Sequence, residues 1–170
     1  MKIVFLDVDG VLVHKGTFHR GRRDSGLWRH LGRIDQKCIH RLIHILRLSG
    51  ARVVVSSSWR LHSDEMAALR KAFEMYQTPL GEETIVGVTG VAPVPRGLIT
   101  DLPRPKEISQ WLEDNGPVEA YVVIDDSPVP GHPQVRVDHG WERGGLQAFH
   151  VSAALQLLGW PPKNGESDEW

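Results

Sequence analysis

The sequence predicts an α/β fold with a parallel sheet, and two observations predict it. Short apolar runs rich in Val and Ile lie at 3–6, 52–55 and 121–124, without the polar alternation of a half-exposed strand. Such runs are typical of strands buried on both faces of a parallel sheet. Stretches with helical spacing separate them, and strands that alternate with helices favour a parallel sheet with right-handed crossovers.

Between the first two strands, the spacing predicts a helix over 35–49. Its apolar residues recur at helical intervals, Asp35 stands where it can cap the first turn, and Gly50 lies just past the end. After the strand at 52–55, we expect a second helix over 64–75 with Ser63 as its cap.

The second half of the chain repeats this alternation. A third helix is expected over 106–114, because Pro105 suits a first helical turn. The strand at 121–124 follows, then a fourth strand at 135–138 and a last helix near 152–158.

The length of 170 residues corresponds to one globular domain, which we expect to span 1–158. Residues 14–33 hold six Lys or Arg, three His and four Gly against one acidic residue, so they predict an exposed basic insertion. Residues 79–103 are rich in Pro, Gly and Thr, which indicates a long loop or a short extra strand. The tail at 159–170 should be loosely held.

The composition excludes several classes of protein. The formal net charge is −1, so the chain as a whole is not a strongly basic nucleic-acid-binding protein, although residues 1–60 carry 12 Lys and Arg against 4 Asp and Glu. Cys38 is the only cysteine, which excludes an intrachain disulfide and favours a reducing compartment. No apolar run approaches the roughly 20 residues of a transmembrane helix. We therefore expect a soluble, cytoplasmic protein.

Polar residues follow the predicted strands where each strand ends. The three segments are Asp7-Val8-Asp9-Gly10, Ser56-Ser57-Ser58-Trp59-Arg60 and Asp125-Asp126-Ser127. Ligands bind beyond the carboxyl ends of parallel strands, so these side chains should converge at one edge of the sheet. Four carboxylates close together need a cation, and oxygen ligands suit Mg²⁺, which also accepts a phosphate oxygen. With hydroxyls and a lysine beside them, the segments predict phosphoryl transfer.

The first segment suggests roles for its residues. Asp7, at the end of the strand, can attack phosphorus and form an aspartyl-phosphate. Asp9 can protonate the leaving oxygen and then take a proton from the hydrolytic water, and Gly10 lets the chain bend sharply. The expected phosphate ligands are small hydroxyls, loop backbone and a cation: Ser56, Ser57, Gly10 and Lys106. Each feature also has a simpler interpretation, as a turn, a helix cap or a solvated face, and the order of the motifs favours the functional one.

These segments resemble the four motifs of the haloacid dehalogenase (HAD) superfamily, in the right order and over roughly residues 3–127. The segments Val-Val-Val-Ser-Ser-Ser-Trp-Arg, Lys-Glu-Ile-Ser-Gln-Trp-Leu and Val-Val-Ile-Asp-Asp are most similar to the HAD domains of Swiss Army Knife RNA-repair proteins. The resemblance implies a Rossmann-like three-layer α/β/α sandwich without a large cap domain. It also implies Mg²⁺ and phosphomonoester hydrolysis through an aspartyl-phosphate.

The resemblance assigns roles to single residues. Asp7 is then the nucleophile and a metal ligand, Asp9 is the acid/base and binds the metal through its carbonyl, and Ser56 holds the phosphate. Lys106 steadies the nucleophile and the phosphate, with Arg104 as the alternative for that role. The pair Asp125 and Asp126 completes the metal site, and which of the two touches the metal directly stays open.

The substrate depends on the basic insertion, because in this superfamily the segment after the first motif covers the site. The insertion is too short for a large cap, so the site should be fairly open. The candidate substrate contacts are basic and aromatic: Arg60, Arg104, Arg20, Arg22, Arg23 and Trp28. They suit a nucleotide or a nucleic-acid terminal phosphate, and a merely solvated loop is an equal alternative. A phosphatase of a small metabolite and a non-catalytic RNA-binding module are the other readings, and no membrane or obligate protein partner is inferred.

Overall fold

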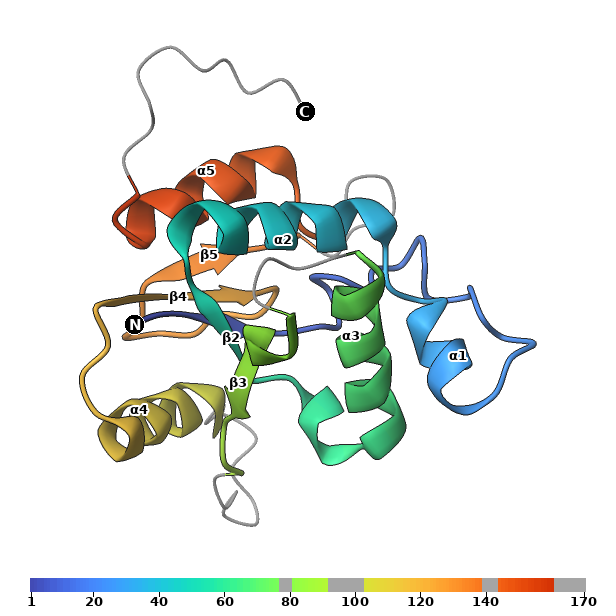
Figure 1. Cartoon of the computed structure of the whole chain (residues 1–170), viewed down its shortest axis with the longest axis horizontal. Helices are drawn as coiled ribbons and strands as arrows, with labels where there is room; N and C mark the ends of the chain where they lie inside the picture. Colours follow the sequence, from blue (N-terminus) through green and yellow to red (C-terminus); the bar gives the residue numbers. More distant parts are fainter. Residues whose placement is uncertain (77–80, 92–102, 139–143, 161–170) are drawn as a thin grey trace.

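The computed structural model describes residues 1–76, 81–91, 103–138 and 144–160, and its centre is a five-stranded sheet (Figure 1). The strand order is β3-β2-β1-β4-β5, and all neighbours are parallel. The strands are β1 (Lys2–Leu6), β2 (Arg52–Val55), β3 (Ile85–Val88), β4 (Ala120–Asp125) and β5 (Gln134–Arg136). The predicted α/β fold with a parallel sheet is confirmed.

Helices cover both faces of the sheet, so the Rossmann-like three-layer sandwich is confirmed as well. In Figure 1, α2 and α5 lie above the sheet and α4 lies below it. The helices are α1 (Gly26–Leu31), α2 (Gln36–Ser49), α3 (Ser63–Met75), α4 (Pro103–Asn115) and α5 (Ala148–Leu157), with 3-10 turns η1 (Ser58–Leu61) and η2 (Gly81–Thr84).

The central strand β1 is buried on both faces. Val4 and Leu6 belong to the core cluster shared with α2, α3 and α5, whereas Ile3 and Phe5 belong to the cluster between the sheet and α4. All four side chains have no exposed surface, and burying each contributes about 1.5–3 kcal/mol. Phe5 also meets Trp111 of α4 edge-on, with ring centroids 5.4 Å apart. This packing fixes β1 and with it the position of the residue that follows, Asp7.

The strand order reverses at β1, because β2 lies on one side of it and β4 on the other. A crevice forms at such a point beyond the carboxyl ends of the strands, and ligands of α/β sheets bind there. The topology therefore places the ligand site between the ends of β1 and β4.

Helix α2 matches its prediction, and α3 differs at its start. The Asp35 carboxylate accepts the backbone N–H of Lys37 at 2.8 Å and that of Cys38 at 3.2 Å, and Gly50 ends α2 with φ +69°. The predicted cap at Ser63 is wrong, since Ser63 is already helical and the cap position holds His62 without a side-chain cap bond.

Several other helix and strand boundaries differ from those that the sequence predicts. Helix α4 begins at Pro103 rather than at 106, and α5 begins at Ala148 rather than near 152. The short extra strand expected within 79–103 is β3, while 92–102 lies outside the described residues, as does 161–170 of the predicted tail. The basic insertion is not exposed throughout, because it contains α1 and the fully buried Thr17. The domain bounds 1–158 stay a prediction.

Candidate active site

Four polar residues stand side by side where the strands end. Main-chain hydrogen bonds continue the ladder one residue beyond the strands: Asp7 N–H donates to Ile124 O (3.0 Å), Ser56 N–H to Leu6 O (2.9 Å) and Thr89 N–H to Val55 O (3.1 Å). Asp125, the last residue of β4, is the partner that the register gives to Asp7. Residues in register point to the same face of a parallel sheet, so the row Thr89, Ser56, Asp7, Asp125 lines one edge.

Three carboxylates form a compact cluster at this edge. Asp7, Asp125 and Asp126 each place an oxygen within 4.8 Å of the others. The Asp125 side chain has no exposed surface, and the Asp7 side chain has 7%. Carboxylates this close repel in a poorly solvated place, so a cation is needed to hold them together. An all-oxygen donor set is the kind that Mg²⁺ prefers.

The cluster perturbs the acidity of its members. Burial raises the pKa of Asp7 to about 6, and the charges of Asp125 and Asp126 add to this effect. Arg104 and a hydrogen bond with Ser57 act against it. Burial likewise raises the pKa of Asp125, against the attraction of Arg104. The cluster therefore binds a cation most favourably above about pH 6, where Asp7 is ionised.

Arg104 supplies positive charge inside the cluster. Its Nη1 lies 3.2 Å from Oδ2 of Asp7 and also contacts Oδ2 of Asp125. Desolvation would lower the pKa of the guanidinium, but the two carboxylates outweigh it and raise the pKa, so Arg104 stays charged. Lys106 lies elsewhere: its exposed side chain lines a different hollow, with Ser109 among its neighbours. The earlier start of α4 explains the difference, because it puts Arg104 in the first helical turn.

Gly10 leaves space for the side chain of Asp126, the second acidic residue of the Asp125-Asp126 pair. Its φ is +84°, which favours glycine, and a Cβ atom at this position would collide with the carboxylate of Asp126. Its N–H donates to the Val13 carbonyl at 2.6 Å, so that amide is already used within the protein. The described contribution of Gly10 is thus space for Asp126 rather than a phosphate contact.

Ser56 and Ser57, the first two residues after β2, are fully buried. Among the described residues, neither the Ser56 hydroxyl nor the hydroxyl of Thr89 beside it in the row has a hydrogen-bond partner. A buried hydroxyl without a partner costs free energy, so Ser56 fits a ligand oxygen at this edge. Ser57 interacts with Asp7 and also accepts the N–H of Trp59 at 3.4 Å, which caps η1.

Asp9 turns its side chain away from the cluster of three. Its Oδ2 accepts the indole N–H of Trp59 at 3.0 Å, and its Oδ1 lies 3.3 Å from Nη2 of Arg33. The side chain is half exposed. Its carboxylate is therefore not one of the clustered metal donors, and the predicted contact through its main-chain carbonyl stays a prediction.

A pocket of about 330 Å³ opens beside Asp7. Asp7 and Arg104 give it a charged end, and several of its other lining residues are apolar: Leu61, Val91, Pro103, Pro128 and Val129. Leu61 and Val91 are themselves 57% and 63% exposed. The volume is at the lower end of the range for small-molecule sites and would hold a compact leaving group.

A family model, the HAD domain in Swiss Army Knife RNA repair proteins, matches residues 3–147. The chain belongs to this HAD family. Membership indicates a HAD-type phosphohydrolase, and the acidic cluster of this HAD domain is one that could hold a metal ion. Searches of curated proteins and of solved structures gave no match. Among the described residues, no helix is both long and apolar enough to cross a membrane.

In this HAD domain, Arg60 links the serine segment after β2 to helix α4. Its Nη1 donates to the carbonyls of Ser56 (2.9 Å) and Ser57 (2.7 Å), and its Nη2 pairs with Glu107 of α4 at 2.9 Å. Only 7% of the Arg60 side chain is exposed. Arg60 therefore holds the serine loop against α4, and its predicted contact with substrate stays a prediction.

The other predicted substrate residues lie on the surface of the insertion. Arg22 and Arg23 are exposed, and Trp28 is 59% exposed, so its ring does not pack inward. Arg20 is exposed as well and lies 3.6 Å from Asp35. Exposed cations and an aromatic ring are what a nucleic-acid strand would contact.

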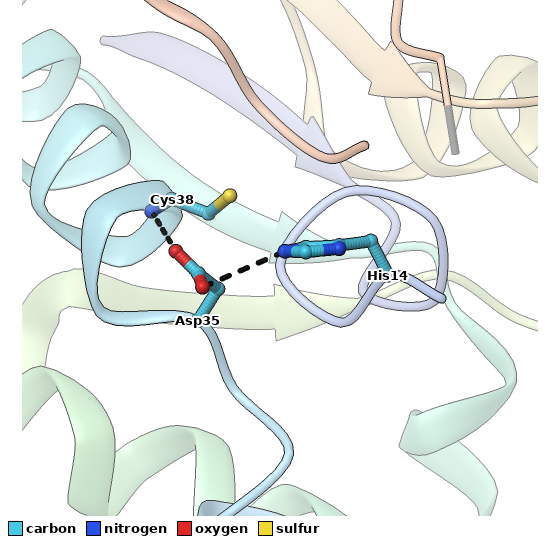
Figure 2. Close-up of side chains that lie close together, drawn as sticks. All are labelled: His14, Asp35 and Cys38. Atoms are coloured by element: carbon cyan, nitrogen blue, oxygen red, sulfur yellow. Dashed lines mark hydrogen bonds and ion pairs between the residues drawn. The ribbon is translucent and has the colours of Figure 1, made fainter. Parts of the chain in front are cut away.

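A second group of possible ligands, His14, Asp35 and Cys38, lies at the start of α2 (Figure 2). Asp35 caps α2 and lies 3.5 Å from Nε2 of His14. The Gly16 N–H donates to Nδ1 of His14, which leaves the proton of the neutral ring on Nε2, toward Asp35. Burial raises the pKa of the Cys38 thiol to about 12, and its sulfur contacts the Leu146 carbonyl. These contacts are those of a helix cap, so we assign the group a structural role.

Sequence reasoning missed the partners of Asp9. In the sequence, Arg33 is one of six cations in the insertion, and Trp59 is one residue of the polar segment after the second strand. They lie 24 and 50 positions from Asp9, so no local pattern could connect them to it.

Proposed function

We propose that this HAD domain is a Mg²⁺-dependent phosphomonoester hydrolase that works through an aspartyl-phosphate on Asp7. The observation that carries the proposal is the meeting of Asp7, Asp125 and Asp126 with Arg104 at one edge of the sheet. Carboxylates and a cation beside a pocket are the components of phosphoryl transfer.

Asp7 acts as the nucleophile in the first step. One of its carboxylate oxygens forms a bond to phosphorus, and the bond from phosphorus to the leaving oxygen breaks. Arg104 supports this step, because its guanidinium lies 3.2 Å from Asp7 and balances charge that builds on the transferred group. Ser56 offers a phosphate oxygen a buried hydroxyl that has no partner in the part of the chain that the structure describes.

The residues present fit a magnesium ion. Asp7, Asp125 and Asp126 supply clustered carboxylate oxygens, as a hard cation requires. When bound, such an ion neutralises phosphate charge and lowers the repulsion that an anionic nucleophile meets. Asp9 adds its main-chain carbonyl in the arrangement that the family implies.

Asp9 moves the protons. It gives one to the leaving oxygen as the first ester bond breaks, and it takes one from the water that then attacks the phosphorus of the aspartyl-phosphate. That second attack restores the Asp7 carboxylate and releases inorganic phosphate. The half-exposed position of Asp9 lets its carboxyl group exchange protons with solvent between turnovers.

The proposed substrate is a nucleotide or the terminal phosphate of a nucleic acid. Three observations support it: the family's description names RNA repair proteins, the insertion exposes Arg22 and Arg23, and its exposed Trp28 offers a stacking surface. The insertion also reaches the catalytic residues, since Arg33 contacts Asp9.

Hydrolysis of an aryl phosphate tests the chemistry. With Mg²⁺, the wild type should turn over 4-nitrophenyl phosphate, and Asp7→Asn or a chelator should abolish turnover while circular dichroism shows an intact fold. Retained turnover by Asp7→Asn would rule out the covalent mechanism.

A substrate panel tests the proposed class. Mononucleotides, sugar phosphates and RNA with a 3′- or 5′-phosphate should be compared at several salt concentrations. A preference for phosphorylated RNA that falls steeply with salt is expected. A preference for sugar phosphates would favour the metabolite phosphatase, and the pocket of about 330 Å³ is of a size that suits one. Tight RNA binding without turnover would favour a binding module.

A further inference from the structure

We propose that Trp59 and Arg33 are positioning residues for Asp9, and that Arg33 couples the basic insertion to proton transfer. This inference rests on the proposed function, because it concerns the acid/base of that reaction. It gives a role to two residues to which the family resemblance assigned none.

Each oxygen of the Asp9 carboxylate has its own donor. Trp59 Nε1 donates to Oδ2 at 3.0 Å, and Arg33 Nη2 lies 3.3 Å from Oδ1. One donor comes from η1 after β2 and the other from the chain between α1 and α2. Two donors from separate elements fix both the rotation and the direction of the carboxylate, which a single hydrogen bond does not.

Trp59 provides the rigid side of this arrangement. Its side chain has no exposed surface and belongs to the main core cluster. A buried indole N–H needs an acceptor, and Asp9 provides it. Because the ring is held in the core, the N–H defines a fixed point for Oδ2.

Arg33 provides the side that reaches the surface of the insertion. Its guanidinium stacks over the ring of Phe18 with 4.6 Å from Cζ to the ring centroid, and Phe18 is 51% exposed in the insertion. Arg33 therefore links Asp9 to the ring of Phe18 in the insertion. A strand of nucleic acid that moves Phe18 would move the donor on Oδ1.

The consequence is chemical. An acid/base held in the wrong direction still allows substrate to bind, so KM should change little while kcat falls. The loss should be larger for a poor leaving group, because such a group depends on protonation of its oxygen, whereas 4-nitrophenolate leaves without it. A residue that only supports the fold would lower both rates in the same proportion.

The kinetic test compares two esters in the full chain with Mg²⁺. For Arg33→Gln and Trp59→Phe, kcat/KM, which reports the steps up to loss of the leaving alcohol and not the later attack of water, should fall about tenfold or more with phenyl phosphate and less than about threefold with 4-nitrophenyl phosphate. Arg33→Lys should recover part of the loss because it keeps a donor. Arg70→Gln, an exposed arginine of α3, is the matched control and should leave both rates unchanged. Equal losses with both esters would overturn the inference.

A second measurement does not need turnover. The indole N–H resonance of Trp59, identified by its loss in Trp59→Phe, should shift upfield in Asp9→Ala and stay in place in Asp24→Ala. An unchanged resonance in Asp9→Ala would overturn the inference even in an active enzyme. If the wild type hydrolyses no ester but the resonance shifts, the proposed function fails while the contact stands, and a catalytic role for Trp59 and Arg33 is then rejected.

Discussion

Arg104 pairs with Asp7 across 3.2 Å, inside the carboxylate cluster at the end of β1. The arginine comes from the first turn of α4, and Asp7 comes from the end of the central strand. The pair joins the layer beneath the sheet to the sheet itself, so α4 has a direct part in setting the charge of the site.

The first prediction concerns this cation. Arg104→Met should lower kcat for an aryl phosphate by about 10²-fold, because it removes charge from the transferred group's surroundings. Lys106→Ala should keep most of the activity, since its side chain lines a different hollow. Steady-state kinetics of both variants measures this. A larger loss in Lys106→Ala than in Arg104→Met would return the role to Lys106.

The second prediction concerns stability and pH. The pKa of Asp7 rises to about 6 on folding, from its ordinary value of 3.8, mainly through burial. The folded chain therefore holds a proton that the unfolded chain has lost between about pH 4 and pH 6, and the free energy of unfolding falls as pH rises through this window. Asp7→Asn removes the ionisation and should raise the Tm of the metal-free protein at pH 8 but not at pH 4.

Thermal unfolding in a chelator gives this comparison directly. The stabilisation at pH 8 is expected to be about 2–3 kcal/mol, from 1.36 kcal/mol per pKa unit. Added Mg²⁺ should stabilise the wild type more than Asp7→Asn, because binding to the folded state raises its stability. A lower Tm for Asp7→Asn at pH 8 would show that burying the ionised Asp7 carboxylate does not destabilise the folded protein.

The third prediction concerns Gly10. Gly10→Ala should weaken Mg²⁺ binding and lower activity at least about tenfold, because the new methyl group would displace the Asp126 carboxylate and the φ of +84° strains any other residue. Calorimetric titration with Mg²⁺ measures the binding. Gly116→Ala is a suitable control for strain alone, since its φ is +78° and nothing lies within 4 Å of the added atom. Unchanged Mg²⁺ binding in Gly10→Ala would separate Asp126 from the metal site.

The fourth prediction concerns the cap of α2. Although burial opposes it, hydrogen bonds from the Cys38 and Lys37 amides lower the pKa of Asp35. Stability from this group is therefore present above pH 4 and is lost as pH falls below it. Asp35→Ala should cost about 1 kcal/mol at pH 7 and less at pH 3. Urea unfolding at both values checks this, and an equal cost at both would reject the role of the charge.

The positions of the carboxylates in the site could be predicted from the sequence, because the parallel sheet brings the ends of its strands together. Parallel strands end at the same edge of a sheet. Acidic residues at the ends of two buried strands are therefore expected at that edge, and this pattern alone predicted the positions of Asp7 and Asp125. The extra strand β3 was harder, because Val86 and Val88 are half exposed and the run is only 4 residues long.

The start of α4 could not be placed from the sequence. The first buried apolar residue of this helix is Ile108, so the periodic signal begins more than one turn late, and Pro103 and Pro105 both suit a first turn. Because of that uncertainty, the sequence alone does not show which of Arg104 and Lys106 lies beside Asp7; in the structure it is Arg104. The contacts of Asp9 with Trp59 and Arg33 depend on how distant elements pack, which no local pattern encodes.

The measurement that tests the central claim most directly is chemical trapping on Asp7. The wild type is mixed with Mg²⁺ and substrate, quenched in acid within the first turnover and treated with borohydride, which reduces an acyl phosphate to the alcohol. Mass spectrometry of the peptide that contains Asp7 should then show homoserine at position 7, and Asp7→Asn treated in the same way should show none. Turnover of substrate without any modification at position 7 would contradict the account.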